Sequence, residues 1–348
     1  MKILITGNLG YVGPGVVYEF KKYHPESTII GFDTGFFAKY ITSNSIIPES
    51  YLHAQYFGDV REFPEYLLEG VDTVVYLAAL SNDPISNKYE ELTFDINYRA
   101  AVDLAKKAKS AGVKNYIYAS SCSVYGTASD EPRKEADEVN PLTAYAKSKV
   151  YTENDLSSVA DHKFKITCFR FATACGMSDR LRLDLVLNDF VAGAVTTGKI
   201  TILSDGTPWR PLINVLDMAR AIRWGHERDH DNGGDFLIVN TGSDEWNFTV
   251  KQLAMKIRDI LPDTQVSVNP DAAPDKRSYR VDFGLFKTLA PDHQPVYDLS
   301  KTIDGLIEGL KQIGFNDPDF RNSKLMRLNV LNYLVEQGKL DSSLRLNS

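Results

Sequence analysis

Cysteine is scarce in this chain, which has only Cys122, Cys168 and Cys175 among its 348 residues. These thiols are too few and too irregularly spaced for the disulfide framework of a small secreted domain or for a zinc-binding cluster. We therefore expect a cytoplasmic protein without a bound metal.

Long apolar runs are missing too, so we expect no segment of membrane-spanning length. The amino terminus passes directly into a predicted strand, without the basic, apolar and cleavable pattern of a leader peptide. Positive charge is also in deficit, since the formal net charge is −7. These absences predict no membrane and no nucleic-acid partner, although an anionic protein can still hold a basic pocket for a phosphorylated small molecule.

What the chain does have is enough apolar material for a large core, with 43% hydrophobic and 24% charged residues. Up to about residue 175, runs rich in Val, Ile, Tyr and Phe alternate with helical patterns, which is typical of βαβ units on a parallel sheet. We predict an α/β fold, a Rossmann doubly wound parallel sheet with a smaller C-terminal lobe. The expected strands cover residues 2–6, 28–33, 73–79, 115–121 and 166–174, with an amphipathic helix over 91–111, a connector over 262–274 and a terminal helix over 324–338.

The first predicted strand ends in Gly7, Gly10 and Gly13, spaced as in a loop that binds a dinucleotide. A helix starting near Tyr11 and Val12 would aim backbone N–H groups and its positive end at a pyrophosphate. Gly10 would let the backbone approach the phosphates, and Gly13 would let helix and strand pack closely. A plain βα turn with glycines looks similar, so the motif depends on its context.

That context is Asp33, which ends the second predicted strand 20 residues after Gly13. A carboxylate there accepts hydrogen bonds from the adenosine ribose hydroxyls and repels a 2′-phosphate. No arginine lies between Thr34 and Ser43, and Lys39 is the only nearby cation. NAD is therefore favoured over NADP as the cofactor.

Two further segments are candidates for contact with the cofactor. Asp59, followed by Val60, would reach the adenine amino group or would instead be a solvated turn acid, and spacing alone does not separate the two. The third strand ends in the small side chains of Leu77, Ala78 and Ala79, where a nucleotide would cross the sheet edge, although small residues also pack under helices without a functional role.

A third set of residues carries acid–base chemistry. Tyr145 and Lys149 are four residues apart and share one helix face, so the ammonium can sit beside the phenol. A free phenol titrates near 10, and a close cation together with a positive nicotinamide ring would lower its pKa enough for Tyr145 to act as a base. Ser121, at the end of the fourth predicted strand, could hydrogen-bond the same substrate oxygen.

Together these motifs resemble the extended short-chain dehydrogenase/reductase family, in particular its nucleotide-sugar epimerases and dehydratases. The resemblance runs from Met1 to about Leu310. It assigns catalysis to Ser121, Tyr145 and Lys149, and it adds Asn97 to the cofactor site. It implies a tightly held NAD that takes a hydride from a sugar carbon, usually C4, and gives it back.

Departures from the family pattern favour one of its reactions. Dehydratases usually carry an Asp-Glu pair after the catalytic residue, and decarboxylases keep a Glu there, whereas this chain has Cys122 and Ser123. Epimerisation at C4 needs no such carboxylate. GDP-fucose synthases use a Ser-Ser-Cys segment with a distant histidine, but no histidine lies between Arg170 and Leu216, so we read Cys122 mainly as a small buried residue beside the substrate.

The second half resembles the family's substrate signature. Arg210 matches an arginine that binds the sugar-nucleotide diphosphate, Asn188 matches an asparagine at that diphosphate, and Arg277 matches a second cation. Ser121, Cys122 and Ser123 complete the expected substrate contacts. The usual Asp and His of the segment are Pro211 and Asn214 here, which suggests an unusual substrate.

The sequence therefore predicts two domains and one main activity. Residues 1–175 are expected to form the NAD-binding domain, and residues 176–348 mainly a substrate-binding lobe, with some segments returning to the first domain. The expected activity is that of a homodimeric NAD-dependent nucleotide-sugar 4-epimerase of carbohydrate biosynthesis. The alternatives are a dehydratase, an NAD(P)H-dependent 4-ketoreductase and a non-catalytic dinucleotide-binding scaffold.

Overall fold

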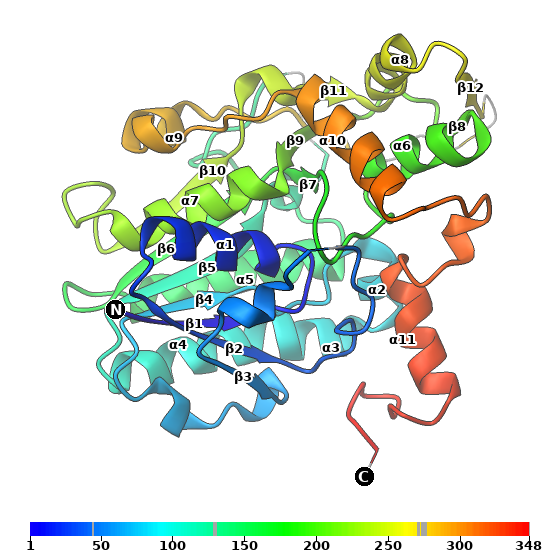
Figure 1. The fold of residues 1–348 in the computed structure, drawn as a ribbon. Helices are drawn as coiled ribbons and strands as arrows, with labels where there is room; N and C mark the ends of the chain where they lie inside the picture. Colours follow the sequence, from blue (N-terminus) through cyan, green and yellow to red (C-terminus); the bar gives the residue numbers. More distant parts are fainter. Residues whose placement is uncertain (44, 128–130, 270–271, 273–276, 348) are drawn as a thin grey trace.

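The computed structural model describes residues 1–43, 45–127, 131–269, 272 and 277–347. Its central sheet contains β1 (Lys2–Thr6), β2 (Thr28–Asp33), β3 (Ala54–Phe57), β4 (Thr73–Tyr76), β5 (Asn115–Ser121), β6 (Lys165–Phe171) and β10 (Phe236–Thr241). The strands pair in parallel in the order β10-β6-β5-β4-β1-β2-β3, which runs outward in both directions from β1 and β4 (Figure 1). The predicted doubly wound α/β fold is confirmed.

Helices cover both faces of this sheet. Those on one face are α1 (Gly13–Tyr23) and α7 (Val215–Glu227), and those on the other include α4 (Ala100–Ser110) and α5 (Ala144–Val159) (Figure 1). Because successive side chains of a strand point to opposite faces, Ile3 and Ile5 of β1 pack with α1 and α7, whereas Leu4 packs with α4 and α5. Both faces of the sheet are thereby buried.

The helix predicted over residues 91–111 is present as three consecutive pieces. They are α3 (Glu90–Phe94), the π-helical turn η4 (Asp95–Arg99) and α4. A π turn inside a helix is uncommon and often lies near a functional site.

Two predicted strands end earlier than the sequence suggests. The strand predicted over 73–79 stops at Tyr76, opposite Thr6, which is the last residue of its neighbour β1. The segment predicted over 166–174 is divided into β6 and β7 (Thr173–Cys175), and β7 pairs with a different sheet. In both places the chain leaves the central sheet at the edge where the cavity described below lies.

The second half of the chain builds a smaller lobe and also returns to the central sheet through β10. The lobe has two small sheets, β11-β9-β7 and β12-β8, packed with helices around a separate apolar core. The segment 262–274 is not only a connector, because it contains β12, which pairs in parallel with β8. The elements are α6 (Val186–Thr197), β8 (Lys199–Ile202), β9 (Trp209–Asn214), β11 (Asn247–Thr249), α8 (Val250–Ile260), β12 (Gln265–Val268), α9 (Gly284–Leu289) and α10 (Leu299–Gln312).

The terminal helix predicted over 324–338 is α11 (Arg327–Glu336). It packs against α2 (Asp83–Lys88), on the side of the molecule where the strands of the central sheet end (Figure 1). Leu331 of α11 joins Leu80, Ile85, Leu340 and Leu344 in a small apolar cluster. The end of the chain is therefore attached to the first half.

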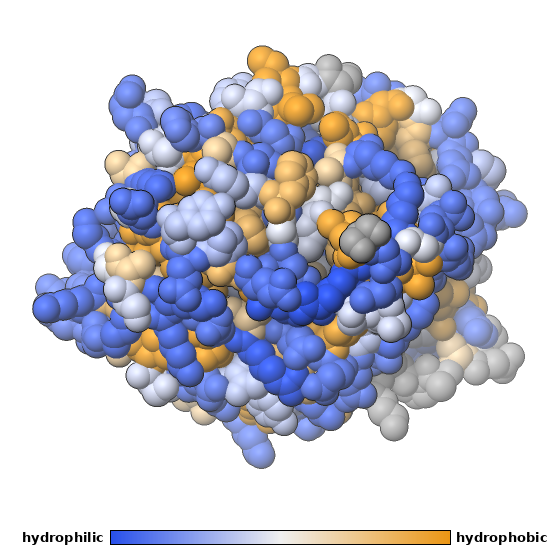
Figure 2. Space-filling model, turned by 90° about the horizontal axis from the view of Figure 1, so that it is seen from below, coloured by the Kyte–Doolittle hydropathy of each residue, from blue (hydrophilic) through white to orange (hydrophobic). Residues whose placement is uncertain are grey.

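The surface seen from below the view of Figure 1 is mostly hydrophilic, with apolar side chains in small groups (Figure 2). Within the described part of the chain, no helix has the length and apolar character needed to cross a membrane.

Candidate active site

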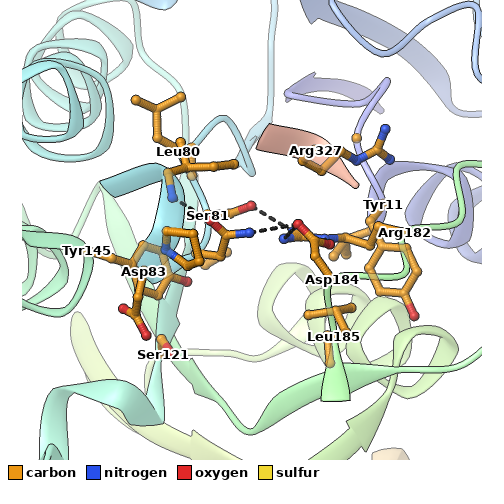
Figure 3. A pocket seen from close by; sticks show the side chains of 18 of the residues that line it. Tyr11, Leu80, Ser81, Asp83, Ser121, Tyr145, Arg182, Asp184, Leu185 and Arg327 are labelled. Carbon is orange, nitrogen blue, oxygen red and sulfur yellow. Dashed lines mark hydrogen bonds and ion pairs between the residues drawn. The ribbon is translucent and has the colours of Figure 1, made fainter. Parts of the chain in front are cut away.

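A cavity of about 790 Å³ lies at the carboxyl ends of the central strands. Loops that follow β1, β2, β4 and β5 line one side, and segments of the second half line the other. Figure 3 shows Ser81 and Asp83 on one side facing Arg182 and Asp184 on the other. Doubly wound sheets bind their ligands at this edge.

The loop after β1 requires glycine at two positions. Gly7 has a φ of 75°, and a Cβ atom there would lie 2.5 Å from the backbone nitrogen of Ala78. A Cβ atom on Gly13 would lie 1.9 Å from the carbonyl oxygen of Asn8. Gly7 therefore lets the loop after β1 approach the loop after β4, and Gly13 lets the start of α1 approach the loop that precedes it.

The start of α1 is open to an anion. The helix begins at Gly13, two residues later than predicted, and no side chain caps it. Gly7, Gly10, Tyr11 and Val12 line the cavity, whereas Gly13 lies behind them. An uncapped helix start beside a glycine loop presents backbone donors that suit a pyrophosphate.

Asp33 lines the cavity at the end of β2. Its carboxylate accepts hydrogen bonds from the backbone nitrogens of Leu9 (3.1 Å) and Gly35 (2.7 Å). Burial raises the pKa of Asp33, while these two donors act in the opposite direction. A carboxylate fixed beside the glycine loop fits the ribose of a bound dinucleotide.

Asp59 and Val60 also line the cavity. Asp59 accepts a hydrogen bond from the backbone nitrogen of Arg61 at 2.9 Å and forms an ion pair with the Arg61 guanidinium. It caps the short helix η2 (Val60–Glu62), so it is not a solvated turn acid. The lining continues through the small side chains after β4, at Leu77, Ala78 and Ala79.

Ser121, Tyr145 and Lys149 lie together in the cavity wall. Thr143 caps α5, which places Tyr145 in the first turn of that helix. The Nζ atom of Lys149 donates to the carbonyl oxygen of Ala119 at 2.7 Å and lies 5.4 Å from the centre of the Tyr145 ring. Figure 3 labels both Tyr145 and Ser121 in the cavity.

Burial shifts the pKa values of both titratable members of this group. It raises the pKa of Tyr145 to about 12, although the Ser121 hydroxyl lowers this pKa by a smaller amount. It lowers the pKa of Lys149 to about 7, against a smaller raising by Glu153. Tyr145 is therefore protonated at neutral pH, and an additional positive charge in the cavity would favour its ionised form.

On the substrate side, Ser123, Arg210 and Arg277 line the cavity. Arg210 donates to the carbonyl oxygens of Trp209 (2.8 Å) and Arg277, and Arg277 forms an ion pair with Asp83. The Ser123 hydroxyl is buried and has no hydrogen-bond partner within the described residues. These groups place a hydroxyl and two guanidinium groups on the cavity wall.

Besides Gly13, three predicted site residues lie behind the cavity wall instead of in it, and the reason is side-chain direction. Cys122 is 1% exposed, and its thiol donates to the carbonyl oxygen of Arg170. The side-chain amide of Asn97 is hydrogen-bonded to both backbone groups of Leu80, so it braces the cavity loop from below.

Asn188 is the third of these residues. Its side-chain oxygen accepts from the backbone nitrogen of Gly176, and its amide nitrogen donates to Tyr11 and to the carbonyl oxygen of Arg182. Because these bonds use both N–H donors of the amide, Asn188 braces the cavity wall, and its contact with a diphosphate stays a prediction.

The motifs did not identify the bridge that crosses the cavity. Arg182 donates to the hydroxyl of Ser81 at 2.8 Å, and the amide of Asn82 donates to Asp184 at 2.7 Å (Figure 3). Arg182 and Asp184 also pair with each other. No local pattern predicts such contacts, because their partners are about one hundred residues apart in the chain. Arg327 of α11 also lines the cavity, although no sequence motif predicted it.

One group of side chains outside the cavity could share a metal ion. The donor atoms of His162, His230 and Asp235 lie within 4.8 Å of one another on the surface. None of the three lines the cavity. This surface group is therefore separate from the cavity.

Comparison with known proteins agrees with this geometry. The model of the NAD dependent epimerase/dehydratase family matches residues 3–241. A UDP-glucose 4-epimerase of Lactobacillus helveticus is 25% identical over 87% of this chain and 96% of its own length. UDP-glucuronic acid decarboxylase 6 of Arabidopsis thaliana is 24% identical over 83% of each chain.

A solved structure extends the likeness to the fold. MoeE5, in complex with UDP-glucuronic acid and NAD, superposes with a TM-score of 0.76 at 22% identity, covering 90% of this chain and 99% of its own. The glycine cradle, the uncapped helix start and Asp33 are the residues that would hold the cofactor here. The chain is therefore an NAD-dependent enzyme and belongs to the NAD-dependent epimerase/dehydratase family.

Proposed function

We propose that this enzyme is a nucleotide-sugar 4-epimerase that acts on a UDP-sugar and keeps its NAD bound throughout the reaction. The proposal is carried by one observation: Ser121, Tyr145 and Lys149 line the same cavity as the glycine loop. Arg210 and Arg277 line it too, and their guanidinium groups suit the oxygens of a diphosphate. One cavity thus offers a place for the cofactor, the reacting sugar and the substrate diphosphate.

In this proposal Tyr145 takes the proton from the sugar C4 hydroxyl and later returns it. A bound NAD would supply the hydride chemistry, by which a hydride leaves C4 and returns to the opposite face of the sugar. Ser121 hydrogen-bonds the reacting oxygen, and Lys149 favours the ionised phenol through its positive charge. The reaction is redox-neutral, since the hydride and the proton both return to the substrate.

The choice of epimerisation over elimination follows from the residues after Ser121. Cys122 is buried and Ser123 is a hydroxyl, so neither supplies the carboxylate that removal of water or carbon dioxide would use. A carboxylate does reach the cavity from another direction, at Asp83, which favours a dehydratase as the second candidate. Its ion pair with Arg277 makes it a binding group in our proposal.

The choice of a UDP-sugar rests on the relatives. Those reported above are named for UDP-glucose and UDP-glucuronic acid, and one was solved with UDP-glucuronic acid. Pro211 and Asn214 differ from the usual family residues, but neither lines the cavity, so these two positions do not indicate which sugar is bound.

We also propose that the enzyme is a cytoplasmic homodimer with its substrate-binding lobe in residues 176–348. Phe94 and Tyr98, from the long helix, pack their rings around Tyr151 of α5, which is 46% exposed. This aromatic group on the outer face of two helices would suit a second copy of the chain. The three cysteines of the chain are free and buried, as expected in a reducing compartment.

The test is turnover of a panel of UDP-sugars by the purified protein without added cofactor. The proposal predicts that denaturing the protein releases NAD, detected by mass spectrometry, and that at least one UDP-sugar is converted to its C4 epimer. A product lighter by one water would instead support the dehydratase, and Asp83→Asn should then abolish it. Conversion that requires added NAD(P)H in proportion to product would support a ketoreductase.

A further inference from the structure

The C-terminal helix brings a buried positive charge into the cofactor side of the cavity. Arg327, the first residue of α11, is 3% exposed and lines the cavity. Its Nη2 atom donates to the carbonyl oxygen of Arg180 at 2.8 Å, and its guanidinium lies 4.3 Å from the centre of the Phe37 ring. These contacts hold the guanidinium beside the loop that follows Asp33.

This charge lacks a matching anion. Arg180 pairs with Glu49 and Arg182 pairs with Asp184, but Arg327 forms no ion pair within the described part of the chain. Its Nη1 atom is buried and has no hydrogen-bond partner there. A buried, unpaired cation is costly unless a ligand supplies the negative charge.

The surroundings of Arg327 increase that cost. Burial, together with the nearby guanidiniums of Arg182 and Arg180, lowers the pKa of Arg327 to about 9, although Asp184 and Asp33 act in the opposite direction. Arg327 therefore remains charged at neutral pH, next to Arg180 and Arg182. Arg182 and Arg327 both line the cavity, and arginines that face one cavity are typical of phosphate recognition.

The chain after α11 closes the same end of the cavity. Leu331 of α11 and Leu344 beyond this helix both line the cavity. The carbonyl oxygen of Ser343 accepts a hydrogen bond from Arg61 at 2.9 Å, next to Asp59. Leu344 has a φ of 54°, which a leucine adopts only at a cost. The tail is thus held against the cavity in spite of local strain. The match to the family model ends at residue 241, so the segment from α11 to Leu344 lies outside the matched residues.

We propose that Arg327 is a cofactor-binding residue whose free guanidinium nitrogen binds a phosphate of the dinucleotide, and that the C-terminal segment from α11 to Leu344 forms the wall over its adenosine half. Asp33, which disfavours a 2′-phosphate, makes the pyrophosphate of NAD the expected partner. The inference rests on NAD binding and not on the sugar reaction, so failure to epimerise a UDP-sugar would leave it standing.

The test compares Arg327→Gln with Lys324→Gln, which removes a cation just before the same helix but outside the cavity. Protein loaded with NAD is diluted, and the rate of NAD release is followed by mass spectrometry. Arg327→Gln should release NAD at least about tenfold faster, the size expected for a charge-assisted hydrogen bond. Lys324→Gln should match the wild type, and Arg327→Lys should recover part of the loss.

Two further readouts separate phosphate binding from a structural role. Without NAD, Arg327→Gln should unfold at the same temperature as the wild type or higher, because an unpaired buried charge is removed. Competition by NADP identifies the phosphate. An equal loss of NAD and NADP affinity supports binding of the pyrophosphate, whereas a loss confined to NADP indicates the 2′-phosphate and overturns the proposal.

The proposal is overturned if Arg327→Gln releases NAD at the wild-type rate. It is also overturned if the variant is less stable without NAD and Arg327→Lys restores stability but not retention. Should Arg327→Gln fail to fold, inorganic pyrophosphate is titrated against the NAD-free wild type. A raised unfolding temperature supports the anion site, and no change contradicts it.

Discussion

The ammonium nitrogen of Lys149 lies 5.4 Å from the centre of the Tyr145 ring, one turn further along α5. It is held there by its hydrogen bond to the carbonyl oxygen of Ala119, so the charge lies over the ring side of the phenol. Burial disfavours the charged forms of both groups, with pKa values of about 12 for Tyr145 and about 7 for Lys149. The positive nicotinamide ring of a bound NAD would add a charge that favours the ionised phenol.

Tyr145→Phe should keep NAD and lose turnover. The ring contacts remain, but the group that exchanges a proton with the substrate is removed, and general acid–base groups contribute about 10²- to 10⁴-fold. The NAD content of the purified variant and its kcat on the UDP-sugar found in the panel are the two measurements. Near-normal kcat would remove Tyr145 from the mechanism.

Lys149→Met should lower activity and stabilise the protein. The pKa of Lys149 in the folded protein, about 7, is below its ordinary value of 10.5, so the unfolded chain binds more protons between pH 7 and pH 10.5. Wild-type stability therefore rises with pH across that window through Lys149, and the full penalty of its burial applies below pH 7.

Urea unfolding at pH 7 and pH 9.5 measures this effect without a substrate. Lys149→Met should be more stable than the wild type at pH 7, and the difference should shrink at pH 9.5. A variant that is less stable at both values would mean that the ammonium contributes favourable contacts that outweigh its desolvation.

The bridge across the cavity should control cofactor exchange. Ser81→Ala removes the acceptor of the Arg182 hydrogen bond and leaves the Asn82 contact with Asp184 intact. Loss of one bond worth about 1 kcal/mol corresponds to roughly fivefold faster NAD release. Ser157→Ala, which removes a local hydroxyl contact on the exposed face of α5, is the matched control. Equal release rates in the two variants would show that the bridge does not restrain the cofactor.

Acid should destabilise the protein through His226, which is packed between α1 and the sheet. Burial lowers the pKa of His226 to about 4, with the neighbouring charges of His24 and Lys165 acting in the same direction and Glu227 and Asp72 against it. The unfolded chain therefore binds an extra proton between pH 6.5 and pH 4, and stability falls in that window by up to about 1.4 kcal/mol per pH unit.

Urea midpoints of the wild type and His226→Asn test this effect at pH 7, 6 and 5. Asparagine keeps an acceptor for the Thr73 hydroxyl, which lies 2.8 Å from the histidine ring. The variant should lose less stability than the wild type between pH 7 and pH 5. Parallel curves would mean that other groups carry the acid sensitivity.

The parts of this enzyme that could be predicted from the sequence are those with local signals. The spacing of Gly7, Gly10 and Gly13 reflects backbone approach within one loop, and the pair Tyr145 and Lys149 shares one helix face. The alternation of strands and helices was sufficient for the fold class. The glycine spacing and the Tyr145–Lys149 pair each lie within a few residues of chain, and the alternation needs only the pattern within each strand and helix.

Side-chain direction and long-range contacts were not predictable in the same way. Cys122 follows Ser121 directly but points into the core, because the chain turns into the short helix η5 (Cys122–Tyr125) at that point. Asn188 lies on the buried side of α6, where both N–H donors of its amide are hydrogen-bonded. Arg327 reaches the cavity only because α11 folds back onto the first half of the chain.

The most direct test of the proposed function follows the hydrogen at C4 of the substrate. The UDP-sugar that the panel identifies is prepared with deuterium at C4 and incubated with the enzyme without added cofactor. We predict a C4 epimer that keeps its deuterium at C4, because the hydride that leaves this carbon returns to it. An epimer that has lost the deuterium to solvent, or carries hydrogen from added NADH, would contradict the account.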